Sequence, residues 1–270
     1  MVARKLVGTG VALAAFSIAG VAGAGVGVKI SGGGDGRGRQ ASLSCPGGMT
    51  RLGHVWDENG SVFPDDPPTV IDRTWATIDE DGYQVENIST GTHNGTHLDA
   101  PGHFVPGGRT IDQLQAEEFV WPAYVIDVRQ RMASAADDGF QLTVQDIKNV
   151  ERRQGKIPKG AMVILQTGFD QYFGTPAYDE AAPGFSAEAV QWMVDQRRIG
   201  GIGSDTYGPD ATSDLDYSAT ATILANDRVA MPDIDAVDSL HRTGDLIIAS
   251  AVPLRDGSAF MVDPLACHAG

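Results

Sequence analysis

Residues 91–103 read GTHNGTHLDAPGH and gather three of the six histidines of the 270-residue chain. The candidate ligands His93, His97, Asp99 and His103 are separated by four, two and four residues. On a helix of about 3.6 residues per turn, Asp99 would lie about 240° round from His93. On an extended strand, these two residues would be about 20 Å apart. Neither regular element brings the side chains together, so we expect the glycines and the proline to let the segment curl.

A curled loop with two imidazoles and a carboxylate is suited to a divalent metal ion. Such ligands fit Zn²⁺, or Mn²⁺ at a higher coordination number. Three protein ligands, His93, His97 and Asp99, leave a position open for water, as in catalytic sites. His103 lies just outside this set, where it could take a proton from that water and deliver it to a leaving group. The sequence predicts one divalent metal with His103 as catalytic acid/base. The alternative is that these histidines lie in the core or on the surface without a metal.

The composition indicates one globular domain with small-molecule rather than nucleic-acid chemistry. The formal net charge is −15 and there is no block of Lys and Arg. Binding to nucleic acid or to an anionic membrane surface is therefore not expected. With 42% apolar residues, the chain can bury the core of a single domain of ordinary size.

The N-terminal segment has the features of an export signal. Arg4 and Lys5 precede the uncharged run 6–28, and the sequence Ala-Gly-Ala at 22–24 matches a signal-peptidase site. An uncleaved membrane anchor is the alternative, because the run is long enough to span a bilayer. Both interpretations predict a secreted or otherwise extracytoplasmic protein.

These observations give the predicted domain organisation. Residues 1–24 form a signal peptide, or an anchor that extends to residue 28, and residues 25–44 form a Gly/Ser-rich linker. Residues 45–270 form a single domain. If the signal is cleaved, no stable membrane span remains.

The two cysteines, Cys45 and Cys267, lie at the two ends of the predicted domain. In an oxidising compartment such a pair can join the termini by a disulfide bond. Two unrelated thiols are the alternative, and the sequence leaves both open.

The rest of the chain alternates predicted strands and helices, which indicates an α/β (α+β) domain. Thr143 and Ser186 are predicted N-caps of two amphipathic helices. Asp256-Gly257 is predicted as the turn of a C-terminal hairpin. The predicted strands cover residues 123–128, 161–168 and 199–205, and the helices cover residues 142–153 and 187–198.

The segment from His93 to His103 resembles the signature of the metal-dependent cyclase family, which includes bacterial kynurenine formamidases and isatin hydrolases. The flanking sequences VFPDDPP, GGRTIDQL, ILQTGFDQYF and GIGSDTYGPD are also similar, so the resemblance covers residues 50–265. It implies a swivelling β/β/α fold, a divalent metal, hydrolysis of amide or lactam bonds beside an aromatic ring, and a homo-oligomer. It also implies that His93, His97 and Asp99 are ligands and that His103 is the acid/base.

One departure from the family bears on the metal count. Dinuclear formamidases carry a later His and, twelve residues on, a Glu as further ligands. Thr220 and Pro232 occupy those places here, and neither supplies a suitable side chain. The resemblance therefore implies a mononuclear site, as in the isatin hydrolase branch.

Three residues are predicted to contact the substrate. Phe63 aligns with a loop aromatic that is often Trp in formamidases. Gln166 ends a buried strand, and Tyr207 lies in the loop after another strand, where loops often carry function.

The predicted function is that of an exported hydrolase that uses metal-activated water to cleave a small cyclic amide, formamide or lactone, with a C–N bond as the expected target. The expected substrate is aromatic or cyclic. A natural-product cyclase or dehydratase with the same metal site is one alternative. A non-catalytic binding protein with a degenerate site is the other.

Overall fold

A computed structural model describes residues 44–134, 139–179 and 181–270. The predicted signal peptide or anchor and nearly all of the predicted linker lie outside the described residues. Residues Cys45–Gly270 form one compact unit. Within the described ranges, no helix has both the length and the apolar character that a membrane crossing requires.

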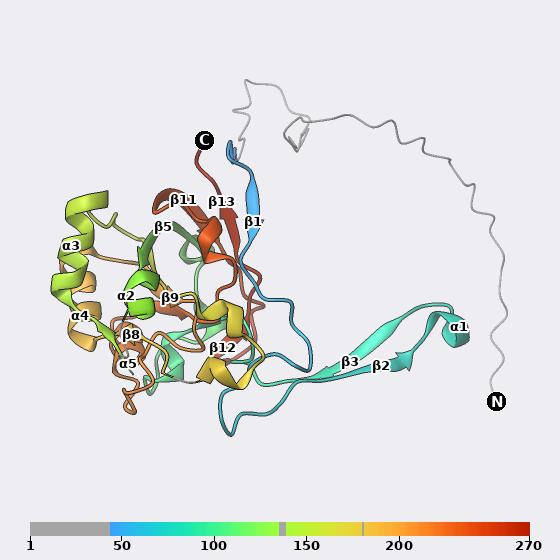
Figure 1. Ribbon diagram of the computed structural model, residues 1–270. Coiled ribbons are helices and arrows are strands. Elements are labelled where there is room, and N and C mark those ends of the chain that lie inside the picture. The colour runs from blue at the N-terminus through green and yellow to red at the C-terminus, as the bar shows by residue number, and fades with distance from the viewer. Residues whose placement is uncertain (1–43, 135–138, 180) are drawn as a thin grey trace. The chain divides into compact units, whose positions relative to one another are not determined.

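A nine-stranded mixed sheet forms the centre of this unit (Figure 1). Strands β5, β7, β9 and β10 are parallel, and the others join antiparallel. In spatial order the strands are β1 (Met49–Arg51), β13 (Leu265–Cys267), β11 (Thr243–Ile248), β5 (Val120–Asp127), β7 (Met162–Gln166), β9 (Gly201–Ser204), β10 (Val229–Met231), β4 (His97–Asp99) and β12 (Ala259–Met261).

The helices begin where the sequence predicts. The Thr143 hydroxyl accepts from the backbone N–H of Asp146 at the start of α3 (Val144–Gln154). Ser186 caps α4 (Ala187–Arg197) in the same way. Both predicted N-caps are therefore confirmed, as are the strands predicted at 123–128, 161–168 and 199–205. Two further α-helices are α2 (Arg129–Ser134) and α5 (Ser218–Ala225).

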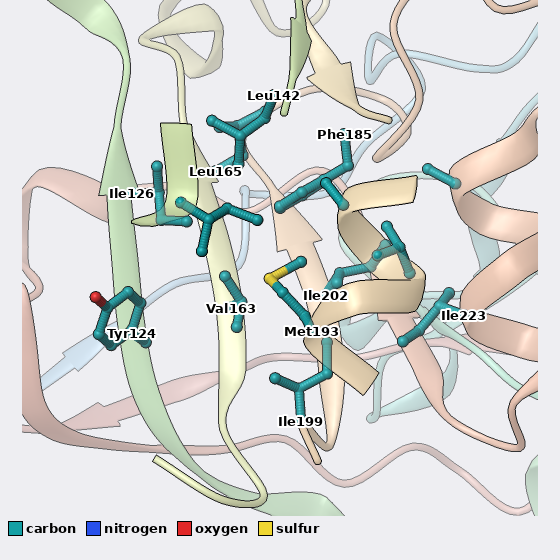
Figure 2. Packing of buried hydrophobic residues seen from close by; sticks show 14 of the residues in the cluster. Tyr124, Ile126, Leu142, Val163, Leu165, Phe185, Met193, Ile199, Ile202 and Ile223 are labelled. Carbon is teal, nitrogen blue, oxygen red and sulfur yellow. The ribbon is translucent and has the colours of Figure 1, made fainter. Parts of the chain in front are cut away.

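Each face of the sheet buries its own apolar cluster, because side chains alternate along a strand. Tyr124 and Ile126 of β5 point to the face covered by α3, α4 and α5, where they meet Val163 and Leu165 of β7 (Figure 2). The intervening Val125 belongs to the cluster on the opposite face. Burying one such side chain contributes about 1.5–3 kcal/mol.

The C-terminal hairpin prediction is wrong. β12 does not pair with β11 but with β4, so that Ala259 lies opposite Asp99. β11 instead pairs with β5 and β13. The alternation of apolar residues specifies a strand but not its partner, and here β12 is used to flank the metal motif.

The sequence analysis did not predict the long two-stranded arm. β2 (Val70–Ala76) and β3 (Val85–Ser89) run out from the sheet, with the short helix α1 (Ile78–Asp81) at the tip (Figure 1). At the base of the arm, the Asn94 side-chain amide donates to the Pro67 carbonyl at 2.9 Å. A second two-stranded sheet is formed by the short parallel strands β6 (Gln141–Leu142) and β8 (Gly184–Phe185).

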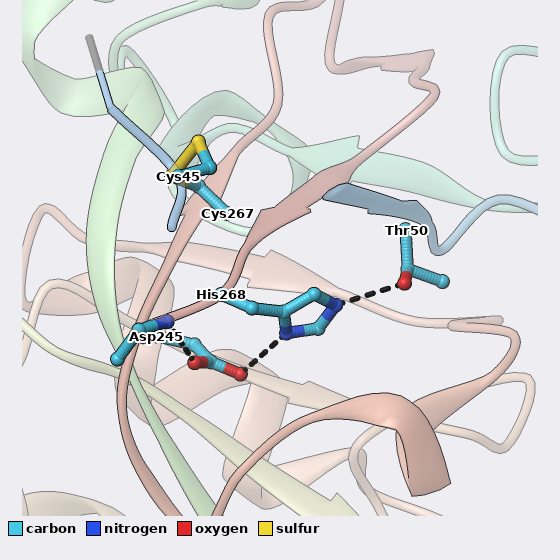
Figure 3. The surroundings of a disulfide bond; sticks show 6 residues. Cys45, Thr50, Asp245, Cys267 and His268 are labelled. Carbon is cyan, nitrogen blue, oxygen red and sulfur yellow. Dashed lines mark hydrogen bonds and ion pairs between the residues drawn. A yellow bond between two sulfur atoms is a disulfide. The ribbon is translucent and has the colours of Figure 1, made fainter. Parts of the chain in front are cut away.

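The two ends of the domain are joined by a disulfide bond between Cys45 and Cys267, which is the first of the two alternatives that the sequence left open (Figure 3). Beside it, the fully buried Asp245 carboxylate accepts from His268 Nδ1 at 2.8 Å and from the Ala269 N–H at 2.9 Å. Burial opposes ionisation, but these donors outweigh it and lower the pKa of Asp245 to about 2. The His268 ring also bonds to the Thr50 hydroxyl of β1, so the terminal strands are held by polar contacts as well.

Replacement of both cysteines, Cys45→Ser/Cys267→Ser, is expected to destabilise the domain by about 2–4 kcal/mol, because the disulfide closes a long loop of the unfolded chain. Denaturant unfolding monitored by circular dichroism measures the change. The oxidised wild type treated with reductant is the matched control and should reach the same midpoint. An unchanged midpoint in the variant would show that the bond adds nothing to stability.

Candidate active site

A cavity of about 540 Å³ opens next to β4 and is lined by all three histidines of the 91–103 segment. His97 and Asp99 lie on β4, which is buried between β10 and β12. His93 lies in the turn that precedes β4, and His103 ends the 3₁₀ turn η1 (Pro101–His103) that follows it. The four side chains thus come from a turn, a strand and a second turn, as the spacing requires.

Gly95 provides the bend between the first two histidines. Its φ is +65°, a left-handed conformation that side-chain-bearing residues rarely adopt. In this conformation the Gly95 carbonyl lies 2.7 Å from Nδ1 of His97. A carbonyl only accepts, so Nδ1 carries a proton and Nε2 faces Asp99 Oδ1 at 3.3 Å. The loop therefore selects the His97 nitrogen that is presented to the site.

His93 is oriented in a comparable way. Its Nε2 lies 2.9 Å from the hydroxyl of Ser258, and its Nδ1 lies 3.0 Å from Asp99 Oδ1. Ser258 directly precedes β12, so the strand pairing that the sequence analysis missed also places this partner. A hydrogen bond to the second ring nitrogen is what fixes a metal-binding imidazole.

Asp99 Oδ1 tests whether a cation fits this site. The atom is buried and has no hydrogen-bond partner among the described residues, although two imidazole nitrogens lie within 3.3 Å of it. A buried carboxylate is costly unless a positive charge compensates it. In the metal-free protein a protonated His97 supplies that charge, and a bound cation would take its place. His93, Asp99 and His103 each offer a ligand atom, and these atoms lie within 4.8 Å of one another. The residues present fit a divalent cation.

His103 differs from the other two histidines. It is more exposed, and its ring packs against His93 at 4.1 Å and against Phe104 at 4.7 Å between centroids. Partial desolvation lowers the pKa of His103, aided by the neighbouring imidazoles and opposed by Asp99. A lowered pKa keeps the ring neutral at neutral pH, which a proton acceptor requires.

Two of the three predicted substrate residues lie at the cavity and one does not. Phe63 and Tyr207 line it, with ring centroids 5.7 Å apart. Gln166 does not line this cavity. Its side-chain oxygen accepts from Arg242 at 2.8 Å, and the residue is buried at the end of β7. A buried polar residue at the end of a strand, such as Gln166, can bond to a structural partner or face a pocket, and the sequence does not show which.

The positions aligned with the second metal site of dinuclear formamidases also reach this cavity. Thr220 and Pro232 both line it. The Thr220 hydroxyl is committed to the Asp210 carboxylate, which also accepts from the Ala219 N–H at 2.7 Å. Burial raises the pKa of Asp210 to about 6 despite these hydrogen bonds.

Several cavity residues were not anticipated from the sequence. Phe104 and Tyr217 add two aromatic rings, with centroids 6.3 Å apart. Phe104 directly follows the motif and could have been found from that position. Tyr217 precedes α5 in a left-handed conformation, φ 51°, and no local pattern placed it near the histidines.

Comparison with known proteins identifies the family of this chain. A family model named Cyclase, described as "Putative cyclase", matches residues 50–211. The chain belongs to this family. An isatin hydrolase from Roseibium aggregatum is 28% identical over 222 residues, which cover 76% of this chain and 83% of the relative. A kynurenine formamidase from Erythrobacter litoralis is 22% identical over 211 residues, which cover 76% of this chain and 89% of the relative.

The fold of the cyclase family is confirmed by solved structures. Isatin hydrolase A from Labrenzia aggregata, bound to benzyl benzoate, superposes with a TM-score of 0.74 at 28% identity, covering 82% of this chain and 94% of that one. A second isatin hydrolase, bound to the product analogue thioisatinate, gives a TM-score of 0.73 at 25% identity, covering 81% and 91%. These relatives are hydrolases of C–N bonds in a metal-dependent family, which confirms the predicted enzyme class at this level.

Metal binding by this cyclase-family site is expected to strengthen as the pH rises from 6.5 to 9. In the metal-free protein, burial favours neutral His97, but the Asp99 carboxylate outweighs burial and raises the pKa of His97 from 6.5 to about 9. The proton therefore competes with the metal. It also stabilises the metal-free fold below pH 6.5, and this stabilisation is lost as the pH rises through 9.

Titration calorimetry with Mn²⁺ in buffers of different ionisation enthalpy measures the protons released. We expect protons to be released when the metal binds at pH 7.5. In thermal unfolding experiments, the rise in Tm caused by the metal should grow toward pH 9. Metal binding without proton release at pH 7.5 would contradict this linkage.

Proposed function

We propose that this protein is an exported, metal-dependent hydrolase that cleaves a small cyclic amide, formamide or lactone. The observation that carries the proposal is Asp99 Oδ1, which is buried, without a hydrogen bond, and faced by nitrogens of His93 and His97. The aromatic rings in the same cavity favour a flat cyclic substrate. Isatin and N-formylkynurenine are natural first candidates, since the relatives are an isatin hydrolase and kynurenine formamidases.

The residues divide into those that hold the ion and one that moves a proton. His93, His97 and Asp99 would hold one Mn²⁺ or Zn²⁺. When bound, such an ion polarises a carbonyl and lowers the pKa of water. His103 Nδ1 or Nε2, neutral at neutral pH, accepts a proton from the attacking water and donates it to the departing nitrogen or oxygen. Phe63 and Tyr207 stack against the substrate ring.

A single ion is proposed because Thr220 and Pro232 occupy the positions where dinuclear formamidases carry the ligands of a second ion. The Thr220 hydroxyl is already bonded to Asp210, and the Pro232 ring has no donor atom. Two metal positions would need ligands that these residues do not supply.

Elemental analysis of the purified protein, combined with turnover of isatin, N-formylkynurenine and a small lactone, tests the proposal. We expect about one metal per chain and hydrolysis of at least one compound, abolished by a chelator and restored by Mn²⁺ or Zn²⁺. Two metals per chain would overturn the mononuclear site. Ring closure or dehydration instead of hydrolysis would favour a cyclase or dehydratase, and metal content without any turnover would favour a binding protein.

Export is proposed from the sequence of residues 1–28 and is supported by the Cys45–Cys267 disulfide. Disulfides persist in oxidising compartments outside the cytoplasm. Fractionation of cells that express the full chain, with mass spectrometry of the mature N-terminus, tests the proposal. A mature chain that begins after Ala24 is expected, whereas an intact N-terminus in the membrane fraction would indicate the anchor.

We further propose that the chain is a homo-oligomer in which the β2–β3 arm of one copy packs on another. Six large apolar side chains of the arm are exposed, including Trp75 at 65% and Ile78 at 65%. At roughly 100 Å² for each side chain, exchange of arms between two copies would remove on the order of 1,200 Å² from water, the size of a specific interface. The six side chains are those of Val70, Trp75, Ile78, Tyr83, Val85 and Ile88.

A Trp75→Ser/Ile78→Ser variant is accordingly expected to shift the protein from oligomer to monomer, as measured by light scattering after size exclusion. The loss of apolar contact area on two large side chains should weaken association at least about 100-fold. The control Val55→Ser/Val252→Ser removes two exposed apolar side chains outside the arm and should leave the mass unchanged. A monomeric wild type would contradict the proposal.

A further inference from the structure

The charge of the substrate cavity is predominantly negative, and the histidines of the 91–103 segment are the basic side chains among the described residues of its lining. Five aspartates line it, and no Lys or Arg is found among the described residues of its lining. A bound divalent cation would offset two of these five negative charges, so the loaded cavity would still be anionic. The aspartates other than the candidate ligand Asp99 are Asp65, Asp66, Asp210 and Asp214.

Two of these carboxylates are used by the fold and two face the ligand space. Asp210 accepts from the backbone at the start of α5, and Asp214 accepts from the Ser218 N–H at 3.2 Å. The side chains of Asp65 and Asp66, by contrast, accept no hydrogen bond from any residue in the described ranges. Asp65 is exposed and Asp66 is half-buried, so both can pair with a charged group of a ligand.

Aromatic rings line the same cavity as these carboxylates. Phe63 lies two and three residues before them, and its ring centroid is 5.8 Å from that of Tyr217 and 5.7 Å from that of Tyr207. Ring faces carry partial negative charge and attract an ammonium group that lies over them. Carboxylates and aromatic faces together form an environment suited to an organic cation.

The same charge acts against an anionic substrate and on the product. Hydrolysis of a cyclic amide or lactone creates a carboxylate, which the aspartates repel. A ligand that carries a carboxylate before reaction would meet the same repulsion. Asp99, the candidate metal ligand, lines the same cavity as Asp65, Asp66 and Phe63, so a substrate whose scissile carbonyl binds beside Asp99 also meets these side chains.

We propose that the substrate is a ring amide, formamide or lactone that bears a protonated amine, and that Asp65 and Asp66 select it over neutral and anionic analogues. This inference rests on the proposed function for the reacting bond. The charge preference itself is a property of the cavity and can be measured without turnover.

Binding of two matched probes to the metal-loaded full chain tests the preference. Benzyltrimethylammonium and phenylmethanesulfonate share a benzyl group and differ in charge, and the sulfonate is a weak metal ligand. Titration calorimetry at low salt should show the ammonium binding at least about tenfold more tightly, with the difference shrinking in about 0.5 M salt as screening increases. Equal or tighter binding of the sulfonate would overturn the proposal.

Paired amide variants locate the effect. In Asp65→Asn/Asp66→Asn, the preference should fall below about threefold. The control Glu117→Gln/Glu188→Gln removes two exposed charges outside the cavity lining and should keep it. If both variants lose the preference equally, net charge and not these two aspartates is responsible, and the assignment is wrong. Circular dichroism confirms that both variants fold.

Turnover of formanilides with an aminomethyl, a methyl or a carboxylate substituent separates the two proposals. We expect kcat/KM to decrease in that order. Hydrolysis of the methyl compound with equal or faster hydrolysis of the carboxylate would overturn the charge selection alone. No hydrolysis of any compound, with the probe preference intact, would overturn the proposed reaction and leave the cation site standing.

Discussion

An Asp99→Asn variant is expected to lose the divalent metal and the activity that depends on it. Asp99 contributes the carboxylate oxygen on which the nitrogens of His93 and His97 converge. The amide has no negative charge to offset a cation in a buried site. We expect metal affinity to fall at least about 100-fold and kcat/KM at least about 1,000-fold. Elemental analysis after dialysis and steady-state kinetics measure the two effects.

Asp205→Asn is the matched control for this substitution. Asp205 is also a fully buried carboxylate, but it accepts from the Thr167 and Gly168 N–H groups and does not line the cavity. That variant is expected to lose stability while it keeps its metal. If Asp99→Asn retains stoichiometric metal, Asp99 is not a ligand and the site must be assigned elsewhere.

A His103→Ala variant is expected to keep its metal and lose turnover. His103 is more exposed than His93 and His97, and its lowered pKa suits a proton acceptor. Loss of a general acid/base reduces rates by about 10²–10⁴-fold. We expect kcat to fall by this factor with little change in KM, and the acidic limb of the pH–rate profile to disappear. Added imidazole should restore part of the rate.

His241→Ala provides the control for His103→Ala, since His241 is an exposed imidazole away from this cavity. Its turnover should match that of the wild type. The geometry allows a second outcome, because His103 offers a ligand atom within 4.8 Å of those of His93 and Asp99. Loss of metal from His103→Ala would make His103 a ligand and contradict its assignment as the acid/base.

Local patterns in the sequence were sufficient for the parts of the fold that depend on neighbouring residues. The caps Thr143 and Ser186, and the strands that became β5, β7 and β9, were predicted because capping and periodicity are properties of a few adjacent residues. The hairpin predicted around Asp256-Gly257 failed because strand pairing joins distant segments, and β12 found its partner in β4.

The candidate site divides in the same way. The spacing of His93, His97 and Asp99 showed that the chain must curl, and Gly95 does adopt the left-handed conformation that permits it. The sequence could not show that Ser258 would orient His93, since 165 residues separate them. It also could not show that Gln166 would lie outside the lining of the cavity and bond to Arg242, because a polar residue that ends a buried strand can face either a pocket or a structural partner.

The sequence by itself determined the chemistry that is available: a histidine and carboxylate cluster in a flexible segment, a pair of terminal cysteines, and the family to which they point. Only the tertiary structure decided what surrounds that chemistry. Packing of β4 between β10 and β12 buries Asp99 away from water, and loops from distant segments bring Asp66 and Tyr217 to one cavity. The physical reason is range: side-chain type and local backbone freedom are written in adjacent residues, whereas burial and electrostatic environment depend on which distant segments meet.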